Sequence, residues 1–549
     1  MPCGEAQGAV VKMEGKSMGD LLDNHIEEIL KNESTPKEVL QKEIEEDYNR
    51  LMTLRINSIT ILDHPILGRI KLDLCQEEGE PQGVYTTVII GANGIGKSRL
   101  LGALAEIFCC LESLYEEKEP NVPRYYFDIV YTIQGETIEF ANFRDINVIE
   151  RGRRLFTHFW YKKGNREVGV KEMLLPKKVI ASATTIMDKY VAKSTKMYRY
   201  KGLRNENSPS TTGTRTMVRK TVDGLLYSLD VKEGFRDELK NLLEYLKLQP
   251  RLELAYSMRY VDVFVKPDMN GQELQRIFEN QSDVFKRATK LWGTHNYEKI
   301  KEEDWQKLEV AADFFRRVAQ RGFDDGRRQL KYDLLEEGYK VTEDREALKI
   351  LSSLDLLTYP SLKVYKSVNG GYEFEQSSSG ESSLLCQMVS IMSDIEPGSL
   401  ILIDEPENSA HPNWQMSYMG WIKSIFEKYF NCHFVISTHS HFILTDLEPA
   451  TSDIVALEKK GDVIKDVSDG VNTFNWSVDD ILYRVFGVCN TRNHAFETDI
   501  MKLYKMMSEG SEDMMEIRRL TEKLSTYELP ENDPLTEILN QARKYVEAE

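Results

Sequence analysis

The residues best suited to carry out chemistry lie between Gly91 and Ser98 and fit the pattern G-x-x-x-x-G-K-S. In order they are Gly91, Ala92, Asn93, Gly94, Ile95, Gly96, Lys97 and Ser98. Glycines at this spacing let the backbone curl so that successive N–H groups point at an anion. Lys97 can then bridge the outer phosphates of ATP, and the Ser98 hydroxyl can ligate Mg²⁺. The pattern predicts a phosphate-binding loop; the alternative is a chance match in a glycine turn.

Two neighbouring carboxylates, Asp404 and Glu405, follow the apolar run Leu400–Ile403. Carboxylates at the end of a buried strand are costly unless a metal or base chemistry uses them. We expect Asp404 to hold Mg²⁺, through water or Ser98, and Glu405 to polarise the attacking water as a catalytic residue. The Lys97 ammonium supplies positive charge beside these two carboxylates of the predicted site.

A histidine and a serine-rich turn extend the predicted site. His439 follows the apolar stretch 431–436, where a strand end would let it sense a γ-phosphate; the alternative is a structural histidine. Ser378, Ser379, Gly380 and Glu381 open a helix over 382–392. A turn of this composition at a helix N-terminus is a second anion cradle.

The elements that must position these residues follow from periodicity. A β-branched run over 85–90 predicts a buried strand before the loop, and helical spacing over 99–108 predicts a helix after it. Alternation predicts further strands at 54–62, 69–74, 156–161 and 178–183, with a hairpin over 124–143 around Gln134 and Gly135. We expect an α/β fold in which a β-rich lobe surrounds a phosphate-loop core.

Composition limits the function classes. The chain has 549 residues and a formal net charge of −18, which argues against a protein coated in nucleic acid. The seven cysteines form no C-x-x-C pair and fit a reducing compartment. The sequence has neither an 18-residue apolar run nor an N-terminal apolar signal core. We expect a cytoplasmic protein with no membrane partner.

Residues 187–220 form the clearest basic patch in this acidic chain. Tyrosines at 190, 198 and 200 lie between the lysines and arginines, as in surfaces that bind a phosphate backbone and stack on bases. The segment 189–220 could therefore contact nucleic acid; the alternatives are a solvated loop and a dock for an acidic protein. Residues 233–350 read as helices, and Leu362–Val368 with Tyr372–Glu375 reads as a hairpin.

These features predict five segments. They are an N-terminal helical arm at 1–51, an ATPase lobe with the phosphate loop and β subdomain at 52–186, a mainly helical insertion with the basic loop at 187–370, a lobe with the Asp-Glu strand and His439 at 371–468, and a helical C-terminal region at 469–549. The arm reads as an oligomer or partner contact, or as a helix packed on its own domain.

The order of these motifs resembles the ABC-type ATPases. Ser378–Glu381 is similar to their signature, and His439 stands where their switch histidine is expected. The long separation of the loop from Asp404 resembles the soluble branch, and Asp404–Pro412 is similar to the Asp-Glu-Pro-Glu…His-Pro stretch of the OLD/RecF-like ATPases. Trp476–Leu482 and Val485–Val488 resemble PtuA, the ATPase family of Septu and some retron anti-phage systems.

The resemblance implies head-to-tail pairing, with each ATP between one subunit's phosphate loop and the other's signature. It implies a homodimer or higher oligomer, an HNH-type nuclease (PtuB-like) as partner, and a reverse transcriptase with its RNA or DNA product where a retron is present. Two alternatives are a DNA-repair or chromosome-maintenance ATPase of the RecF/SMC type and an OLD-like ATP-gated nuclease. We expect no nuclease activity from this chain alone, with exposed Phe486, Phe496 and Tyr504 in the tail as the dock for the partner.

Overall fold

The computed structural model divides into two compact units, Met1–Asn475 and Trp476–Glu549. It describes residues 53–75, 84–144, 156–204, 214–280, 305–323, 328–336, 341–354, 356–358, 360–367, 370–374, 379–461, 463–468, 473, 476, 478–484, 494–508, 513–527 and 534–547. The arm predicted at 1–51, Ser378 and Phe486 lie outside these residues.

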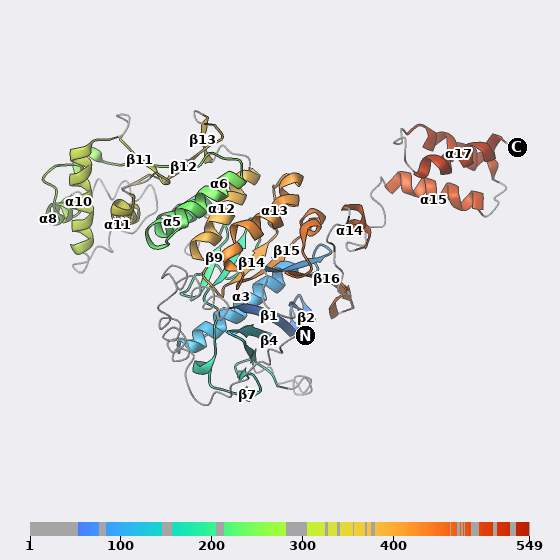
Figure 1. Ribbon diagram of the computed structural model, residues 1–549, viewed down its shortest axis with the longest axis horizontal. Helices are drawn as coiled ribbons and strands as arrows, with labels where there is room; N and C mark the ends of the chain where they lie inside the picture. Colours follow the sequence, from blue (N-terminus) through green and yellow to red (C-terminus); the bar gives the residue numbers. More distant parts are fainter. Residues whose placement is uncertain are drawn as a thin grey trace, which may run out of the picture. The chain divides into compact units, whose positions relative to one another are not determined.

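A mixed sheet of 13 strands is the centre of the first unit, in the order β7-β6-β5-β4-β1-β2-β17-β16-β3-β15-β14-β8-β9 (Figure 1). Its strands are β1 (Leu54–His64), β2 (Gly68–Asp73), β3 (Tyr85–Gly91), β4 (Tyr126–Ile133), β5 (Glu136–Ala141), β6 (Trp160–Lys163), β7 (Arg166–Glu167), β8 (Val179–Ala183), β9 (Tyr198–Lys201), β14 (Leu400–Asp404), β15 (His433–Ser437), β16 (Ser452–Lys460) and β17 (Val463–Asp466). From β16 to β9 the neighbours pair in parallel, so their carboxyl ends meet at one edge. The expected α/β fold class is confirmed.

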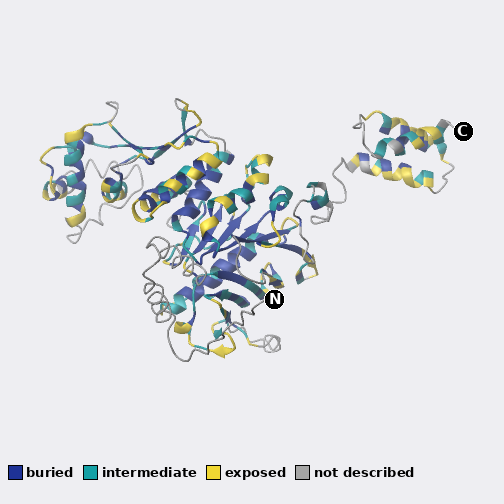
Figure 2. Ribbon diagram, in the orientation of Figure 1, coloured by how far each residue is buried: buried dark blue, intermediate teal, exposed yellow. Residues whose placement is uncertain are grey.

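Helices cover both faces of the parallel strands. Helix α3 (Lys97–Tyr115) packs on one face, and α12 (Ser379–Asp394) packs on the other, with α5 (Thr214–Val231), α6 (Phe235–Tyr245) and α13 (Pro412–Ile425) beyond it (Figure 1). Every residue of β14 is buried, and the central strands are dark blue in Figure 2. Leu400 and Leu402 belong to the core that includes α3, so the alternate Ile401 and Ile403 face the opposite side.

The antiparallel half of the sheet is the β-rich lobe, and β4 and β5 form the predicted hairpin. Gln134 and Gly135 have φ angles of 55° and 72°, the left-handed values that a tight hairpin turn requires. The strand predicted over 156–161 is only partly right, because β6 begins at Trp160. Its ladder partner β5 ends at Ala141, opposite Trp160, so earlier residues have no strand to pair with. Short 3₁₀ helices among the described residues of this unit are η1 (Val170–Glu172), η5 (Glu427–Tyr429) and η6 (His441–Asp446).

The insertion contains a second, antiparallel sheet in the order β11-β10-β12-β13. Its elements are β10 (Leu252–Ser257), β11 (Gln329–Asp333), β12 (Ser361–Tyr365), β13 (Gly371–Glu373), α7 (Val261–Phe264), α8 (Gly271–Asn280), α10 (Trp305–Arg321) and α11 (Val341–Ser353). The helical prediction for 233–350 is therefore wrong at β10 and β11. In β10 alternate residues are buried, and its partner β12 lies far along the chain, beyond the reach of local pattern. The predicted hairpin is confirmed by the pairing of β12 with β13.

The basic segment is built into the fold, and the expectation of stacking tyrosines is wrong. Tyr190, Tyr198 and Tyr200 are at most 3% exposed, with Tyr198 and Tyr200 on β9. Arg199 and Lys201 both pair with Asp394 at the end of α12, and Arg204 pairs with the buried Asp188. These cations neutralise carboxylates of the same chain, and the tyrosine rings pack inside the core. Lys193 and Lys196 remain exposed.

The second unit is helical, as predicted, and has its own core. Its helices among the described residues are α14 (Val478–Arg484), α15 (His494–Ser508), α16 (Met514–Ser525) and α17 (Pro534–Glu547). Leu503, Ile517, Leu520 and Leu524 are fully buried in the core of α15, α16 and α17. Phe496 is 8% exposed in that core, so its predicted role as an exposed docking residue is wrong; Tyr504, at 57%, is exposed as predicted.

The ion pair between Lys201 and Asp394 gives a test of this account of the basic segment. Lys201→Glu places a second carboxylate beside Asp394, whose side chain is only 16% exposed. We expect the free energy of unfolding to fall by about 3 kcal/mol or more, because the poorly solvated Asp394 loses one of its two cations and gains a like charge beside it. The matched control, Lys193→Glu, reverses an exposed lysine of the same segment and should cost less than about 0.5 kcal/mol. Equal effects of the two substitutions in denaturant unfolding would contradict the assignment.

Candidate active site

The phosphate-binding loop lies between the end of β3 and the start of α3. Gly96 is the N-cap of α3 at φ 113°, and a Cβ there would lie 2.4 Å from Leu67 Cδ2. Only glycine accepts both the conformation and the space. No side chain among the described residues caps this end of α3. Its first N–H groups, which have no carbonyl partner within the helix, are therefore left to an anion.

Lys97 is buried, and its ammonium is turned back across the loop. Its Nζ donates to the Gly91 carbonyl at 2.9 Å and lies 3.3 Å from Nδ1 of His439. Burial lowers the pKa of Lys97 to about 8, against the opposing effect of Glu405, Glu407 and Asp404. The ammonium is thus held at the point where the loop, the strand ends and the histidine meet.

Asp404 is the last residue of β14, beside the first turn of α3. It is 3% exposed and accepts hydrogen bonds from the hydroxyls of Ser437 and Ser98. Burial raises the pKa of Asp404, and the carboxylates of Glu405 and Asp188 add to this effect. The structure therefore brings together Ser98 and Asp404, the two predicted metal ligands. A hydroxyl and a carboxylate are hard oxygen donors of the kind that Mg²⁺ takes alongside phosphate oxygens and water.

Glu405 is fixed by contacts on its backbone and on its carboxylate. It has φ 48°, a left-handed value that is uncommon for a non-glycine residue. Its N–H donates to the Ser437 carbonyl at 3.0 Å, and its carbonyl accepts from Thr184 Oγ1 at 3.1 Å. Asn408 Nδ2 donates to Glu405 Oε2 at 2.9 Å. The side chain keeps 29% exposure, so a water molecule can reach the carboxylate.

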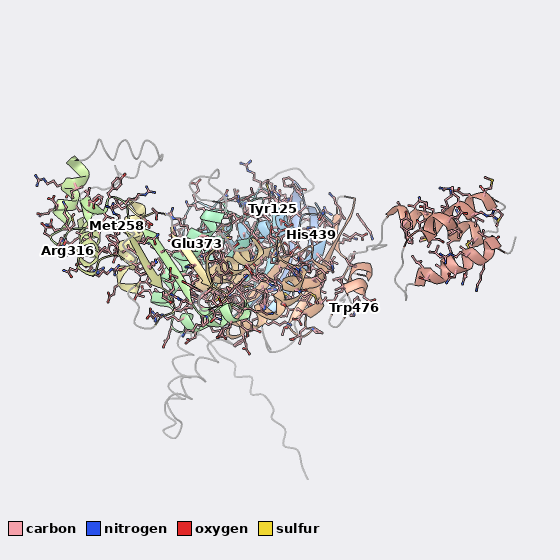
Figure 3. The ribbon with its side chains drawn as sticks, turned by 90° about the horizontal axis from the view of Figure 1, so that it is seen from above. Tyr125, Met258, Arg316, Glu373, His439 and Trp476 are labelled. Atoms are coloured by element: carbon pink, nitrogen blue, oxygen red, sulfur yellow. The ribbon has the colours of Figure 1, made fainter. Side chains whose placement is uncertain are left out.

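His439 lies between the two charged groups (labelled in Figure 3). Its Nδ1 faces Lys97, and its Nε2 lies 3.6 Å from Glu405 Oε1. Its backbone N–H donates to Glu407 Oε1 at 2.6 Å. Burial and the Lys97 ammonium lower the pKa of His439, with Glu405 opposing, so the ring is neutral at pH 7. With Nδ1 accepting from Lys97, the Nε2–H is directed at Glu405.

The serine-rich turn lies elsewhere in the first unit. Ser379 begins α12, and a Cβ on Gly380 would lie 2.5 Å from the Ser409 carbonyl oxygen. Glu381 pairs with Lys366 at 2.7 Å and accepts from the Tyr372 hydroxyl at 3.4 Å. Gly380 thus packs against the loop that follows Glu405, and its nearest neighbours do not include the phosphate-binding loop.

Sequence reasoning missed four residues that hold the site together: Thr184, Glu407, Asn408 and Ser437. Thr184 directly follows the fully buried strand β8, which pairs with β14, and this position was the available signal. His411 has a structural role that the resemblance did not reveal. It is the N-cap of α13, its ring accepts from Asn413 N, and Pro412 begins the helix.

The comparisons with known proteins concern the fold and part of the site. A family model described as "AAA domain, putative AbiEii toxin, Type IV TA system" matches residues 226–445, a span that includes Glu405 and His439. No curated protein matches the chain. The match agrees with the P-loop ATPase class that the phosphate-binding loop predicts.

Similar solved structures include head domains of Smc proteins. The Smc head domain with an extended coiled coil bound to the C-terminal domain of ScpA, from Pyrococcus furiosus, is 12% identical over 75% of this chain and 96% of that chain, with a TM-score of 0.29. The SMC head domain from Thermotoga maritima is 10% identical over 75% of this chain and 98% of that chain, with a TM-score of 0.30.

No helix among the described residues is both long and apolar enough to cross a membrane. In the same part of the chain no three His, Cys, Asp or Glu side chains gather into a metal cluster.

The lowered pKa of Lys97 predicts a pH dependence for ATP binding. A lysine with a pKa of about 8 carries its charge below that pH and loses it above. The dissociation constant for ATP should therefore rise by about tenfold per pH unit above about pH 8, where the ATP phosphates are fully ionised. Titration calorimetry between pH 7 and 10 measures this rise. Lys97→Arg keeps its charge, so its weaker binding should stay level; a rise of the same slope in that variant would contradict the assignment.

Proposed function

We propose that this chain is an ATPase subunit that binds ATP with Mg²⁺, dimerises around the nucleotide and controls a separate nuclease in anti-phage defence. One observation carries the ATPase proposal. His439 lies 3.3 Å from the Lys97 ammonium and 3.6 Å from the Glu405 carboxylate, so residues at the ends of three separate elements meet at the carboxyl edge of the parallel strands. Ligands of α/β proteins bind at this edge.

Each residue has a chemical role in the proposed reaction. The N–H groups at the start of α3 and the Lys97 ammonium neutralise the phosphates of ATP. Ser98 and Asp404 would hold Mg²⁺, which when bound withdraws charge from the phosphate oxygens. Glu405 accepts the proton of the attacking water, and the Nε2–H of His439 is available to an oxygen of the transferred phosphoryl group.

The position of Gly380 indicates how two paired copies would influence each other. In the ABC-type ATPases that the chain resembles, the signature completes the nucleotide site of a second subunit. Here Gly380 packs against Ser409, in the loop whose Asn408 binds the carboxylate of Glu405. A partner's nucleotide that contacts the start of α12 would therefore press on the loop that holds this chain's own Glu405.

The second unit is the proposed dock for the nuclease. It folds around its own core, so it can present a surface without disturbing the ATPase lobe. Met501 and Tyr504 lie three residues apart on α15 and are 62% and 57% exposed, and Met515 on α16 is 87% exposed. Exposed apolar side chains of this size suit a protein partner.

Glu405→Gln should trap the ATP-bound pair. The amide keeps the size of the side chain and the Asn408 contact but cannot accept a proton, so ATP should bind while hydrolysis falls by about a hundredfold or more. Light scattering with ATP and Mg²⁺ should then give twice the monomer mass. Glu458→Gln, at an exposed position of β16, is the control and should leave hydrolysis unchanged. A Glu405→Gln protein that stays monomeric with bound ATP would refute the pairing.

Association with the nuclease should depend on the second unit. After co-expression with an HNH-type nuclease, the chain should retain the nuclease on affinity purification, and Met501→Asp with Tyr504→Asp should release it. Arg518→Asp, on an exposed position of α16, is the matched control. A purified chain that by itself degrades DNA or RNA with Mg²⁺ or Mn²⁺ would refute the division of labour, because the chain would then hold its own nuclease site.

A further inference from the structure

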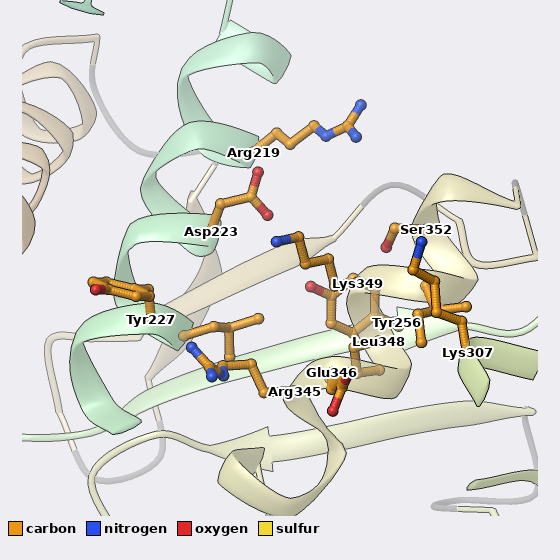
Figure 4. A pocket seen from close by; sticks show the side chains of 12 residues that line it. Arg219, Asp223, Tyr227, Tyr256, Lys307, Arg345, Glu346, Leu348, Lys349 and Ser352 are labelled. Carbon is orange, nitrogen blue, oxygen red and sulfur yellow. The ribbon is translucent and has the colours of Figure 1, made fainter. Parts of the chain in front are cut away.

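A large cavity lies between α5, which packs against α12, and the part of the insertion that holds the second sheet. Its volume is about 960 Å³, at the upper end of the range for small-molecule sites. Four elements line it: α5, β10, α10 and α11. None of the residues proposed for the ATPase site is among its lining residues. In Figure 4 the side chain of Lys349 on α11 points across the gap toward Asp223 on α5.

The cavity is basic although the chain is acidic. Four cations line it, Arg219, Lys307, Arg345 and Lys349, against the carboxylates of Asp223 and Glu346. The formal charge of the whole chain is −18, so a concave surface with more basic than acidic groups stands apart from the rest. The cations come from three different helices, and a single anion between them could be approached from several sides.

The walls also offer aromatic and hydrogen-bonding groups. Tyr227 on α5 is 50% exposed, and the Arg345 guanidinium lies 5.8 Å from the centre of its ring. Arg345 is held in place by an ion pair with Asp230 at 2.7 Å. Ser352 and Tyr256 add hydroxyl groups on the opposite side. A phosphate group fits the cations, and a nucleobase can stack on an exposed tyrosine or on a guanidinium plane.

The α5 wall is firmly attached to α12. Ser228 Oγ donates to the Ser393 carbonyl at 3.2 Å, and Lys232 Nζ donates to the carbonyls of Met392 and Ile395 at 2.8 Å. A Cβ on Gly224 would lie 2.8 Å from Ser393 Oγ, so the two helices approach closely there. The other end of α12 carries Ser379 and Gly380, which belong to the proposed nucleotide site of the partner copy.

We propose that this cavity is a second binding site, for a phosphate-bearing ligand of nucleotide size. The ligand contacts both α5 and α11. Because α5 is attached to α12, a shift of α5 on binding also moves α12. Binding itself does not depend on the proposed ATPase function; only its expected influence on ATP turnover rests on that function. The phosphate can belong to a free nucleotide or to the end of a nucleic acid strand, and the experiment separates these two sources.

The test uses the full chain with Lys97→Ala as background, so that the phosphate-binding loop does not compete for the probes. Fluorescence anisotropy measures binding of a short single strand with a 5′-phosphate and of the same strand without it, and calorimetry measures binding of ATP and of tripolyphosphate. Arg345→Glu with Lys349→Glu should weaken binding by about tenfold or more, because two of the four cations become carboxylates. Lys459→Glu with Lys460→Glu, on exposed positions of β16, makes the same change in charge outside the cavity.

A preference for the 5′-phosphorylated strand that is lost in the cavity variant supports a nucleic acid end, and binding of ATP or tripolyphosphate alone supports a free phosphate ligand. If Arg345→Glu with Lys349→Glu does not fold, Arg219→Glu with Lys307→Glu repeats the test from two other helices. The proposal is overturned if none of the probes binds, or if the cavity variants bind as well as the control. Loss of ATP turnover in the wild-type chain, with cavity binding intact, would count only against the ATPase function.

Discussion

The structure is organised around an excess of buried negative charge at the carboxyl edge of the parallel strands. Asp404, Glu405 and Glu407 crowd three carboxylates around a single buried ammonium, that of Lys97. Burial disfavours the charged form of these groups, which raises the pKa of Asp404 and Glu407 and lowers the pKa of Lys97. Buried charges with shifted pKa values cluster at sites that bind or react with a ligand. A metal ion bound with a triphosphate would supply positive charge beside the carboxylates.

The loop after β14 connects this edge with the rest of the first unit. Glu405 adopts a left-handed backbone conformation, and hydrogen bonds from Thr184 and to Ser437 keep it there. Those bonds tie β8, β14 and β15 to one residue, so a shift of any of the three strands changes the direction of the carboxylate. Four residues further along, Ser409 touches Gly380 at the start of α12. Glu405, the proposed base, and the serine-rich turn are therefore mechanically coupled within one chain.

The basic residues of the insertion lie in two different environments. Some form ion pairs within the fold: Arg199 and Lys201 with Asp394, Arg204 with Asp188, and Arg317 and Arg321 with the buried Asp344. In contrast, Arg219, Lys307 and Lys349 lie exposed around a cavity, together with Asp223 and Glu346. The sequence does not distinguish the two groups, because burial depends on how distant elements pack. What separates them is whether the fold encloses the cation beside a buried carboxylate or leaves it exposed at a concave surface.

The sequence by itself determined the elements whose signal is local. The phosphate-binding loop between a strand and a helix, the strand that ends in Asp404, and the β4–β5 hairpin all follow from spacing and turn chemistry within a few residues, and the structure has them where they were predicted. The tertiary structure alone decided what depends on distant partners. It placed β10 in a sheet with β12, buried Tyr198 and Tyr200 in β9, and brought Thr184 to Glu405. Strand pairing, burial and side-chain contacts join residues far apart in the chain, and no window of sequence contains both members of such a pair.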